Sequence, residues 1–290
     1  TADPDLYRQA EKAVGAALAL EPQHLEARKA AIWIKLGMHE FAAALRYAQA
    51  LNAEVPDDVQ VYGFLVDANA ELGRYPQAEE SAQWMLDLRP GNIAALTRAA
   101  FLRELFGDVE GAIMLMQAAY QRTPVIESED RAWVATHLAH LELARGRHED
   151  ADKLAQHALE LFPGYHYALA QLTKVRLAQG RVDEAVALLR KHVAAAPHPE
   201  NFYALGVALH KAGKTREARA MLAEFEQKAR AEMNGWDNAN RELVMYYVEQ
   251  ARQPAKAVAV ARMEAARRED VYTLDALAWA LSAAGKHAEA

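Results

Sequence analysis

Residues 73–92 read GRYPQAEESAQWMLDLRPGN. In this stretch a glycine is followed five residues later by Ala78, and Pro90 closes an amphipathic run. The prolines repeat at a fixed interval, since Pro22, Pro56, Pro90 and Pro124 stand 34 residues apart. A fixed period of this length indicates a repeat architecture. The same glycine–alanine spacing recurs at Gly37/Ala42, Gly73/Ala78, Gly107/Ala112, Gly146/Ala151, Gly180/Ala185, Gly213/Ala218 and Gly285/Ala290.

One period, residues 59–92, predicts a pair of helices. Apolar residues at helical spacing run from Val59 to Leu72, and Gly73 is the residue type that most easily takes the left-handed turn after a helix. A second helix is predicted from Pro76 to Leu88, where Pro90 stops it because proline has no N–H to donate. Each period is therefore predicted to be a helical hairpin.

Small side chains recur at one position of each predicted helix. Without bulk beyond Cβ, paired helices can approach to the short end of the usual range of about 8–10 Å. On the first helices these residues are Ala100, Ala139, Gly206 and Ala278, and on the second helices Ala78, Ala112, Ala151, Ala185, Ala218 and Ala257.

Composition narrows the function classes. A formal net charge of -7 and a pI near 5.9 argue against a duplex nucleic-acid binder, which needs a basic surface. With no cysteine, disulfides, thiol nucleophiles and thiolate metal sites are excluded. No apolar run approaches the roughly 20 residues of a membrane-spanning helix, and no signal sequence opens the chain, so no membrane insertion is expected. The compartment stays undecided.

The 34-residue helical hairpin, with Leu205-Gly206, Gly213, Ala218 and the closing prolines, resembles the tetratricopeptide repeat. The resemblance implies an all-α solenoid of about 16 helices, wound as a right-handed superhelix with the first helix of each hairpin on the concave side. Residues 1–290 are predicted to form one such domain, because each unit needs only its neighbours. We assign a half repeat at 5–22, repeats at 25–58, 59–92, 93–126, 132–165, 166–198, 199–232 and 238–270, and a truncated repeat at 271–290.

Some stretches depart from the pattern. Arg252 stands where glycine is expected, and the repeat at 238–270 has no closing proline. In the first full repeat Gly37 predicts a first helix two residues short, which leaves the facing of Trp33 open. Insertions near 125–131 and 231–237 are expected to lengthen the links or extend a helix. The chain stops at the head of a helix, from which we expect a fragment or a processed chain.

No catalytic fingerprint occurs, since the nucleophile elbow, the P-loop and the dinucleotide glycine motif are all missing. His137 and His140 could share one edge of a metal ion, but no third ligand is evident, and solvated histidines are the expected reading. Acidic pairs such as Asp57/Asp58 fit helix starts, where carboxylates accept free N–H groups. We therefore predict a non-catalytic protein without cofactor or resident metal.

The family geometry implies that first-helix positions line the concave groove. Nearly every repeat contributes an aromatic residue there, a type enriched at protein interfaces. Several of these rings could instead pack between adjacent helices, which remains the competing interpretation. The expected partner-binding residues are Phe64, Asp67, Arg98, Phe101, Trp133, His137, His140, Tyr167, Lys174, Tyr203, Tyr246 and Trp279, with Thr136 and Gln171 also expected to be exposed.

The leading hypothesis is a scaffold that binds an extended peptide or helix of a protein partner. Arg98 and Lys174 would favour an acidic part of that partner at the centre of the groove. The family's carboxylate clamp is not reproduced, since Gly63, Asp67, Ala170 and Val207 occupy its positions. Two alternatives stay open: a carbohydrate-binding solenoid of exopolysaccharide export, and the recognition arm of an enzyme whose catalytic domain lies elsewhere. The half repeats at both ends also make end-to-end self-association plausible.

Overall fold

The computed structural model describes residues 4–290, and the chain packs into two compact units within that range. Unit 1 combines the residues up to Leu88 with Ala229–Ala290, and unit 2 is Arg89–Lys228. The described residues are all-helical, which confirms the predicted class, and sixteen α-helices are present among them. A single solenoid domain with a right-handed superhelix stays a prediction, because each unit is described by itself.

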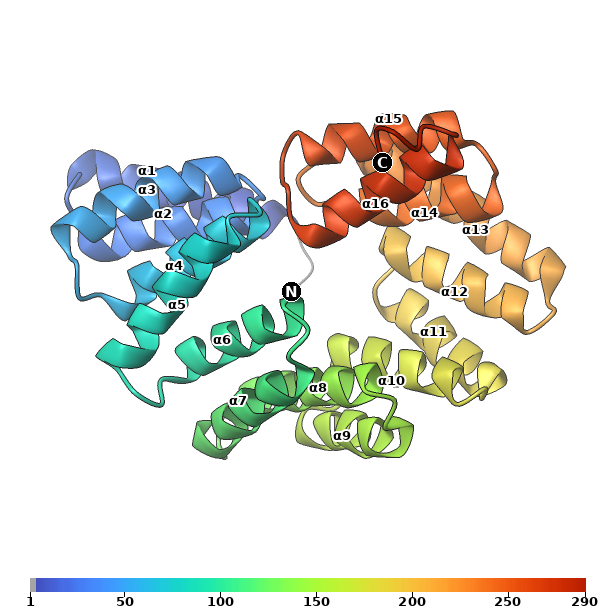
Figure 1. Cartoon of the computed structure of the whole chain (residues 1–290), viewed down its shortest axis with the longest axis horizontal. Coiled ribbons are helices and arrows are strands. Elements are labelled where there is room, and N and C mark those ends of the chain that lie inside the picture. Colours follow the sequence, from blue (N-terminus) through green and yellow to red (C-terminus); the bar gives the residue numbers. More distant parts are fainter. Residues whose placement is uncertain (1–3) are drawn as a thin grey trace. The chain divides into compact units, whose positions relative to one another are not determined.

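Unit 2 holds four hairpins (Figure 1): the helices from α6 to α12 pack in succession, and side chains of α12 and α13 share a core cluster. Its first helices are α6, α8, α10 and α12, and α8 also contacts α10 directly. The helices are α6 (Ile93–Leu105), α7 (Val109–Arg122), α8 (Ser128–Ala144), α9 (His148–Leu161), α10 (His166–Ala178), α11 (Val182–Ala195), α12 (Pro199–Lys211) and α13 (Thr215–Glu232), the last of which runs on into unit 1.

Unit 1 is built from both ends of the chain (Figure 1). A five-residue π-helix, η1, interrupts one of its hairpins and buries Tyr247. Here too the hairpins stack, as α2 against α4 and α14 against α16. The helices are α1 (Pro4–Leu20), α2 (Leu25–Gly37), α3 (Phe41–Glu54), α4 (Val59–Glu71), α5 (Tyr75–Leu88), α14 (Asn240–Met245), η1 (Tyr246–Gln250), α15 (Pro254–Ala265) and α16 (Val271–Ala283).

The small residues lie where the helices cross. Ala78, Ala112, Ala151, Ala185, Ala218 and Ala257 on the second helices are at most 1% exposed. On the first helix α12, a Cβ at Gly206 would stand 2.7 Å from the Leu222 side chain of α13. The small second-helix residues are thus buried as predicted, and Gly206 leaves room for a close approach of α12 and α13.

The left-handed residue after each first helix explains the sequence period. Gly73, Gly107, Gly146, Gly180, Gly213 and Gly285 all have positive φ, and in two further hairpins His39 (φ 57°) and Arg252 (φ 52°) take that position. In these two hairpins, too, a buried alanine follows five residues after the left-handed residue: Ala44 after His39 and Ala257 after Arg252. The spacing therefore belongs to the turn geometry, and glycine is its usual but not its obligatory occupant.

This geometry corrects one prediction. The first helix of repeat 25–58 is not short: α2 has 13 residues, as α4 has, because His39 rather than Gly37 makes the turn. Gly37 is instead the last residue of the helix, and the ring of Tyr7 fills the space where its Cβ would lie. The helix register then leaves Trp33 on the surface, 66% exposed.

Both predicted insertions lengthen a helix and a link. Helix α8 begins four residues before the repeat boundary, and the loop ahead of it exposes Val125 (82%) and Ile126 (91%). Arg131 of α8 spans this loop by donating hydrogen bonds to the carbonyl of Thr123 (2.9 Å) and to that of Tyr120 (3.4 Å). The second insertion extends α13 to Glu232 and then forms the loop that carries Trp236.

Two aspartates act as helix caps, and for Asp58 this was predicted. Asp58 accepts hydrogen bonds from the backbone N–H groups of Gln60 (2.9 Å) and Val61 (3.1 Å). Asp108 accepts one from Gly111 at 2.8 Å. These carboxylates satisfy N–H groups that have no partner inside the helix. Within residues 4–290, every helix is too short or too polar to span a bilayer.

Candidate functional site

The twelve predicted partner-binding residues fall into two sets. Unit 1 carries four of them, and unit 2 carries eight on its successive first helices. The two sets are described separately, so one groove that joins them stays a prediction. In unit 1 they are Phe64, Asp67, Tyr246 and Trp279, and in unit 2 Arg98, Phe101, Trp133, His137, His140, Tyr167, Lys174 and Tyr203.

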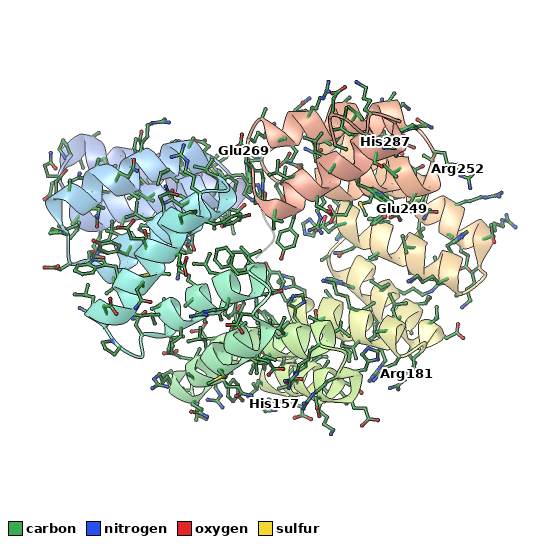
Figure 2. The ribbon with its side chains drawn as sticks, in the orientation of Figure 1. His157, Arg181, Glu249, Arg252, Glu269 and His287 are labelled. Atoms are coloured by element: carbon green, nitrogen blue, oxygen red, sulfur yellow. The ribbon has the colours of Figure 1, made fainter. Side chains whose placement is uncertain are left out.

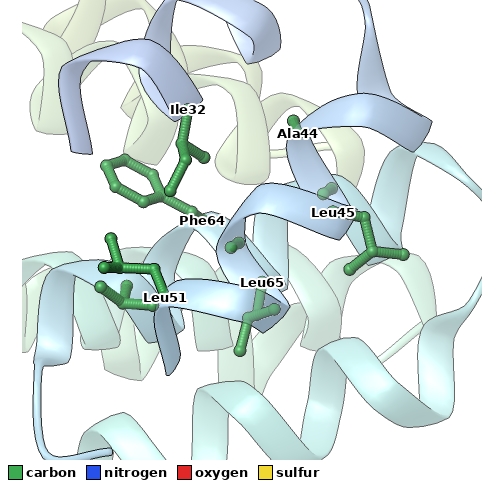
Figure 3. Close-up of a cluster of buried hydrophobic side chains, with 9 residues drawn as sticks. Ile32, Ala44, Leu45, Leu51, Phe64 and Leu65 are labelled. Carbon is green, nitrogen blue, oxygen red and sulfur yellow. The ribbon is translucent and has the colours of Figure 1, made fainter. Parts of the chain in front are cut away.

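Phe64 is wrong as an exposed contact residue. Its side chain is 4% exposed and lies in a core cluster with Ile32 and Leu51 (Figure 3). Helix α4 packs against α2, and the ring fills the space between these helices. Phe64 is therefore a ring that packs between adjacent first helices, as the competing interpretation in the sequence analysis expects.

Two polar residues that we expected on the surface are also buried. Thr136 is 6% exposed and donates its hydroxyl proton to the carbonyl of Ala132 at 2.7 Å. Gln171 is 4% exposed and belongs to the buried side of α10. Positions that face a neighbouring first helix thus include polar side chains, which the family geometry alone does not reveal.

Unit 2 presents what we call the aromatic surface, formed by Phe101, Trp133, His137 and Tyr167. Tyr167 of α10 is 56% exposed and Phe101 of α6 is 38% exposed. On α8, the half-buried rings of Trp133 and His137 lie 3.9 Å apart between centroids. The exposed rings on α6 and α10, with the half-buried rings on α8, contrast with the small buried residues at the helix crossings.

Histidines on α8 fix part of this surface. The imidazole of His137 donates from Nδ1 to the carbonyl of Trp133 at 3.0 Å, and burial lowers the pKa of His137, so the ring is neutral at neutral pH. His140 Nε2 lies 2.6 Å from a carboxylate oxygen of Glu104 on α6. This contact ties two first helices together at the level of the aromatic surface.

A further polar contact stiffens the second-helix layer of unit 2. The Tyr120 hydroxyl and His157 Nε2 are 2.7 Å apart and join α7 to α9, and Figure 2 shows His157 on the latter. Arg131 places its guanidinium 4.1 Å from the centroid of the Tyr120 ring. Tyr120 thus links its own helix, α7, to both α8 and α9.

The remaining predicted residues of unit 1 have varied surroundings. Trp279 of α16 is half exposed, at 49%. Asp67 on α4 is partly buried, and Tyr246 lies in η1 with its ring 5.5 Å from that of Tyr247. The described part of the chain contains no group of three or more histidine, aspartate or glutamate side chains placed to hold a metal ion.

Sequence reasoning missed a cluster in unit 1 that joins the two ends of the chain. It includes Arg268, Glu71 and Asp270, with Trp236 nearby. The signal was present, because Trp236 lies in an insertion and Arg268 directly precedes Glu269, which stands where a closing proline is missing. From sequence alone, however, an irregularity of the repeat does not show which residues it contacts.

The sequence matches the family described as tetratricopeptide repeat over residues 142–205 and again over residues 202–224. No curated protein sequence matches the chain. Among solved structures, a tetratricopeptide repeat protein from Parabacteroides merdae is similar at 14% identity and a TM-score of 0.56, over 89% of this chain and 99% of that one.

Two further structures are similar over nearly the whole chain. The human IFIT1 dimer with PPP-AAAA is 12% identical, with a TM-score of 0.65 over 98% of this chain and 75% of that one. The Cut9–Hcn1 hetero-tetramer of the APC/C is 14% identical, with a TM-score of 0.64 over 95% of this chain. This chain spans only 52% of the length of that relative. At these identities the likeness concerns the fold.

The repeat matches, the helical hairpins and the left-handed turn that precedes each buried alanine agree with one another. Residues 142–224 match the tetratricopeptide-repeat family, and the described residues have the fold of a tetratricopeptide-repeat solenoid.

Proposed function

We propose that the protein is a non-catalytic scaffold that binds an extended peptide or a helix of a protein partner. Tetratricopeptide-repeat proteins generally present their first helices to protein partners, and this family role supports the coarse function. The aromatic surface of unit 2 is the observation that carries the finer proposal. Large rings with polar edges offer contact area at a small cost in side-chain entropy.

The charges on the same helices suggest what the partner contains. Arg98 of α6 and Lys174 of α10 accompany the aromatic surface, so the partner segment carries acidic residues beside its apolar ones. Asp67, Tyr203, Tyr246 and Trp279 remain proposed contact residues, whereas Phe64 is excluded by its burial.

Photo-crosslinking tests this proposal. A photoreactive phenylalanine at Tyr167 should crosslink to a defined segment of a protein in extracts of the producing cells, whereas the same group at Met114 should not. Met114 is a matched control, because it is 70% exposed but lies on the second helix α7.

The crosslinked segment is then made as a synthetic peptide and its affinity measured by fluorescence anisotropy. Tyr167→Ala should weaken binding about tenfold or more, as loss of a well-packed aromatic contact does. Equal affinities for the variant and the parent would contradict the proposal. Binding to a glycan array that is lost in Trp133→Ala and Tyr167→Ala would overturn it in favour of carbohydrate recognition.

A further inference from the structure

The two irregular stretches of the sequence meet the first repeats at one place in unit 1. We call this contact the clasp. It joins residues of α3, α4 and α5 to the segment that leads into α16, and Figure 2 shows Glu269 on that segment. The clasp consists of Phe41, Glu71, Gly73 and Tyr75 on one side and Arg268, Glu269, Asp270 and Val271 on the other.

Main-chain groups meet directly in the clasp. The N–H of Glu269 donates to the carbonyl of Glu71 at 3.1 Å, and the N–H of Val271 donates to the Tyr75 hydroxyl at 2.7 Å. Gly73 leaves the necessary room, because a Cβ there would stand only 2.5 Å from the carbonyl oxygen of Glu269. The fit therefore depends on the backbone as well as on side chains.

Arg268 is the central side chain. Its guanidinium lies against the carboxyl group of Glu71, donates to the carboxylate of Asp270 at 2.6 Å, and lies 5.3 Å from the centroid of the Phe41 ring. It thus contacts the first repeats through the Glu71 side chain and the face of the Phe41 ring.

A second contact supports the clasp from the loop after α13. The Trp236 ring meets that of Tyr7 edge-on at 5.2 Å between centroids, and meets that of His39 at 6.4 Å. Arg267 fixes this loop by donating to the carbonyls of Asn234 (2.9 Å) and Gly235 (2.8 Å). The loop and Arg268 therefore engage the first repeats together.

The charges of the clasp do not balance when every carboxylate is ionised. Arg268 serves both Glu71 and Asp270, and Asp67 adds a further negative charge on α4. Burial raises the pKa of Glu71 to about 7, Arg268 opposes this rise, and Asp270 and Asp67 add to it. The Glu71 side chain is about one third exposed, but its Oε2 is buried.

The other groups that face the clasp keep one charge state near neutral pH. Burial raises the pKa of Tyr75, which therefore keeps its proton. Burial, with Arg268 as the next cause, lowers the pKa of His39, which stays neutral above its usual range. The pKa of Asp270 is lowered by its hydrogen bonds to Thr273 and Arg268 despite its burial, so Asp270 stays ionised. Glu71 is the clasp residue whose charge changes between about pH 6 and pH 8.

We propose that the clasp is a proton-operated latch, which holds the last repeats against the first while Glu71 carries a proton and loosens when Glu71 ionises. Ionisation leaves one guanidinium between two carboxylates, and the uncompensated negative charge favours exposure of Glu71 to water. The latch concerns unit 1 and is independent of which partner the aromatic surface binds.

Energy transfer between two dyes tests the latch. The chain has no cysteine, so Arg46→Cys on α3 and Ala255→Cys on α15 give two unique attachment sites on exposed positions. Transfer efficiency should fall as the solution goes from about pH 6 to about pH 8.5, with a midpoint near pH 7. Glu71→Gln, which cannot ionise, should keep the value of the acidic solution throughout.

Further variants make the result decisive. Arg268→Ala should give the low-efficiency state at both pH values, because the guanidinium contact is lost. Arg190→Ala, which removes an exposed ion pair with Glu217 in unit 2, should titrate as the parent does. A parent efficiency that is constant over this pH range, or a Glu71→Gln variant that titrates as the parent, would overturn the proposal.

Discussion

Single residues explain where this chain follows the repeat and where it departs from it. Glycine is favoured at position 73 for two reasons: its φ of 68° is left-handed, and the missing side chain leaves room for the carbonyl of Glu269. Arg252 shows the opposite case, in which a side chain occupies a left-handed position that glycine would take more easily. His39 does the same, but its ring is part of the contact with Trp236.

Arg252→Gly should stabilise the protein. The left-handed conformation costs an L-residue about 1–2 kcal/mol, of which part is offset by the greater freedom of glycine in the unfolded chain. We expect the free energy of unfolding, measured with urea, to rise by about 0.5–1 kcal/mol. Arg252→Ala keeps Cβ and is the control, so an equal gain in both variants would show that strain at this residue is not the cause.

Gly73→Ala should destabilise the protein more than Gly146→Ala does. Both glycines have positive φ, but no atom lies within 4 Å of a Cβ at Gly146. The control should cost about 1 kcal/mol and Gly73→Ala about 1–3 kcal/mol more, because the clasp must shift. Thermal and urea unfolding measure both; matching losses would mean that Glu269 does not press on this position.

At the scale of helices and turns, the sequence predicted most of the fold. The 34-residue period, the closing prolines and the buried alanines placed the hairpins close to their observed bounds, as α4 and α5 show. The predicted end of α2 is wrong because glycine is the residue type that predicts this turn, whereas His39 makes it. Conformational propensity predicts which residue type is favoured in a turn. A tertiary contact, such as that of Tyr7 with Gly37, can place the turn at a different residue.

Ala151→Leu should overpack the crossing of α8 and α9. Ala151 has no exposed surface, so a larger side chain must push the helices apart or take a strained rotamer. We expect a loss of about 1–3 kcal/mol in the free energy of unfolding. Gln156→Leu on the exposed side of α9 is the matched control and should change stability by less than about 0.5 kcal/mol. Unchanged stability in Ala151→Leu would count against close packing at this crossing.

At the scale of the whole molecule, the candidate site was less predictable than the fold. The family geometry correctly indicated Tyr167 and Phe101 as exposed rings, but it could not show that Phe64 fills a gap beside Ile32. Which face of a first helix is covered depends on the neighbouring hairpin. The clasp could not be predicted either, because Glu71 and Arg268 are separated by most of the chain and belong to no repeated pattern.

The pH dependence of stability should reveal the clasp in the intact protein. The pKa of Glu71 is higher in the folded chain than its ordinary value, so the folded state holds this proton more firmly. Its contribution is fully present below about pH 4.5 and is lost as the pH rises through about 7. The difference in free energy of unfolding between the parent and Glu71→Gln should therefore change over this interval.

Histidines with a lowered pKa act in the opposite direction and must be separated from Glu71. Burial lowers the pKa of His137, His166 and His192, so their contribution is present above about pH 6.5 and is lost as the pH falls through their folded values. These histidines are unchanged in Glu71→Gln, and the difference between the two curves removes them. Parallel curves for parent and variant would exclude Glu71 as the source.

The loop between α7 and α8 has a consequence for how the protein would be cut. Val125 and Ile126 are highly exposed apolar side chains in a surface loop, and such loops are preferred sites of proteolysis. Arg131, which follows Val125 and Ile126 in the chain, donates hydrogen bonds to the carbonyls of Tyr120 and Thr123, which precede them. Cleavage in this loop would break the covalent chain but leave α7 packed against α8. The two fragments would therefore stay associated until the protein is denatured.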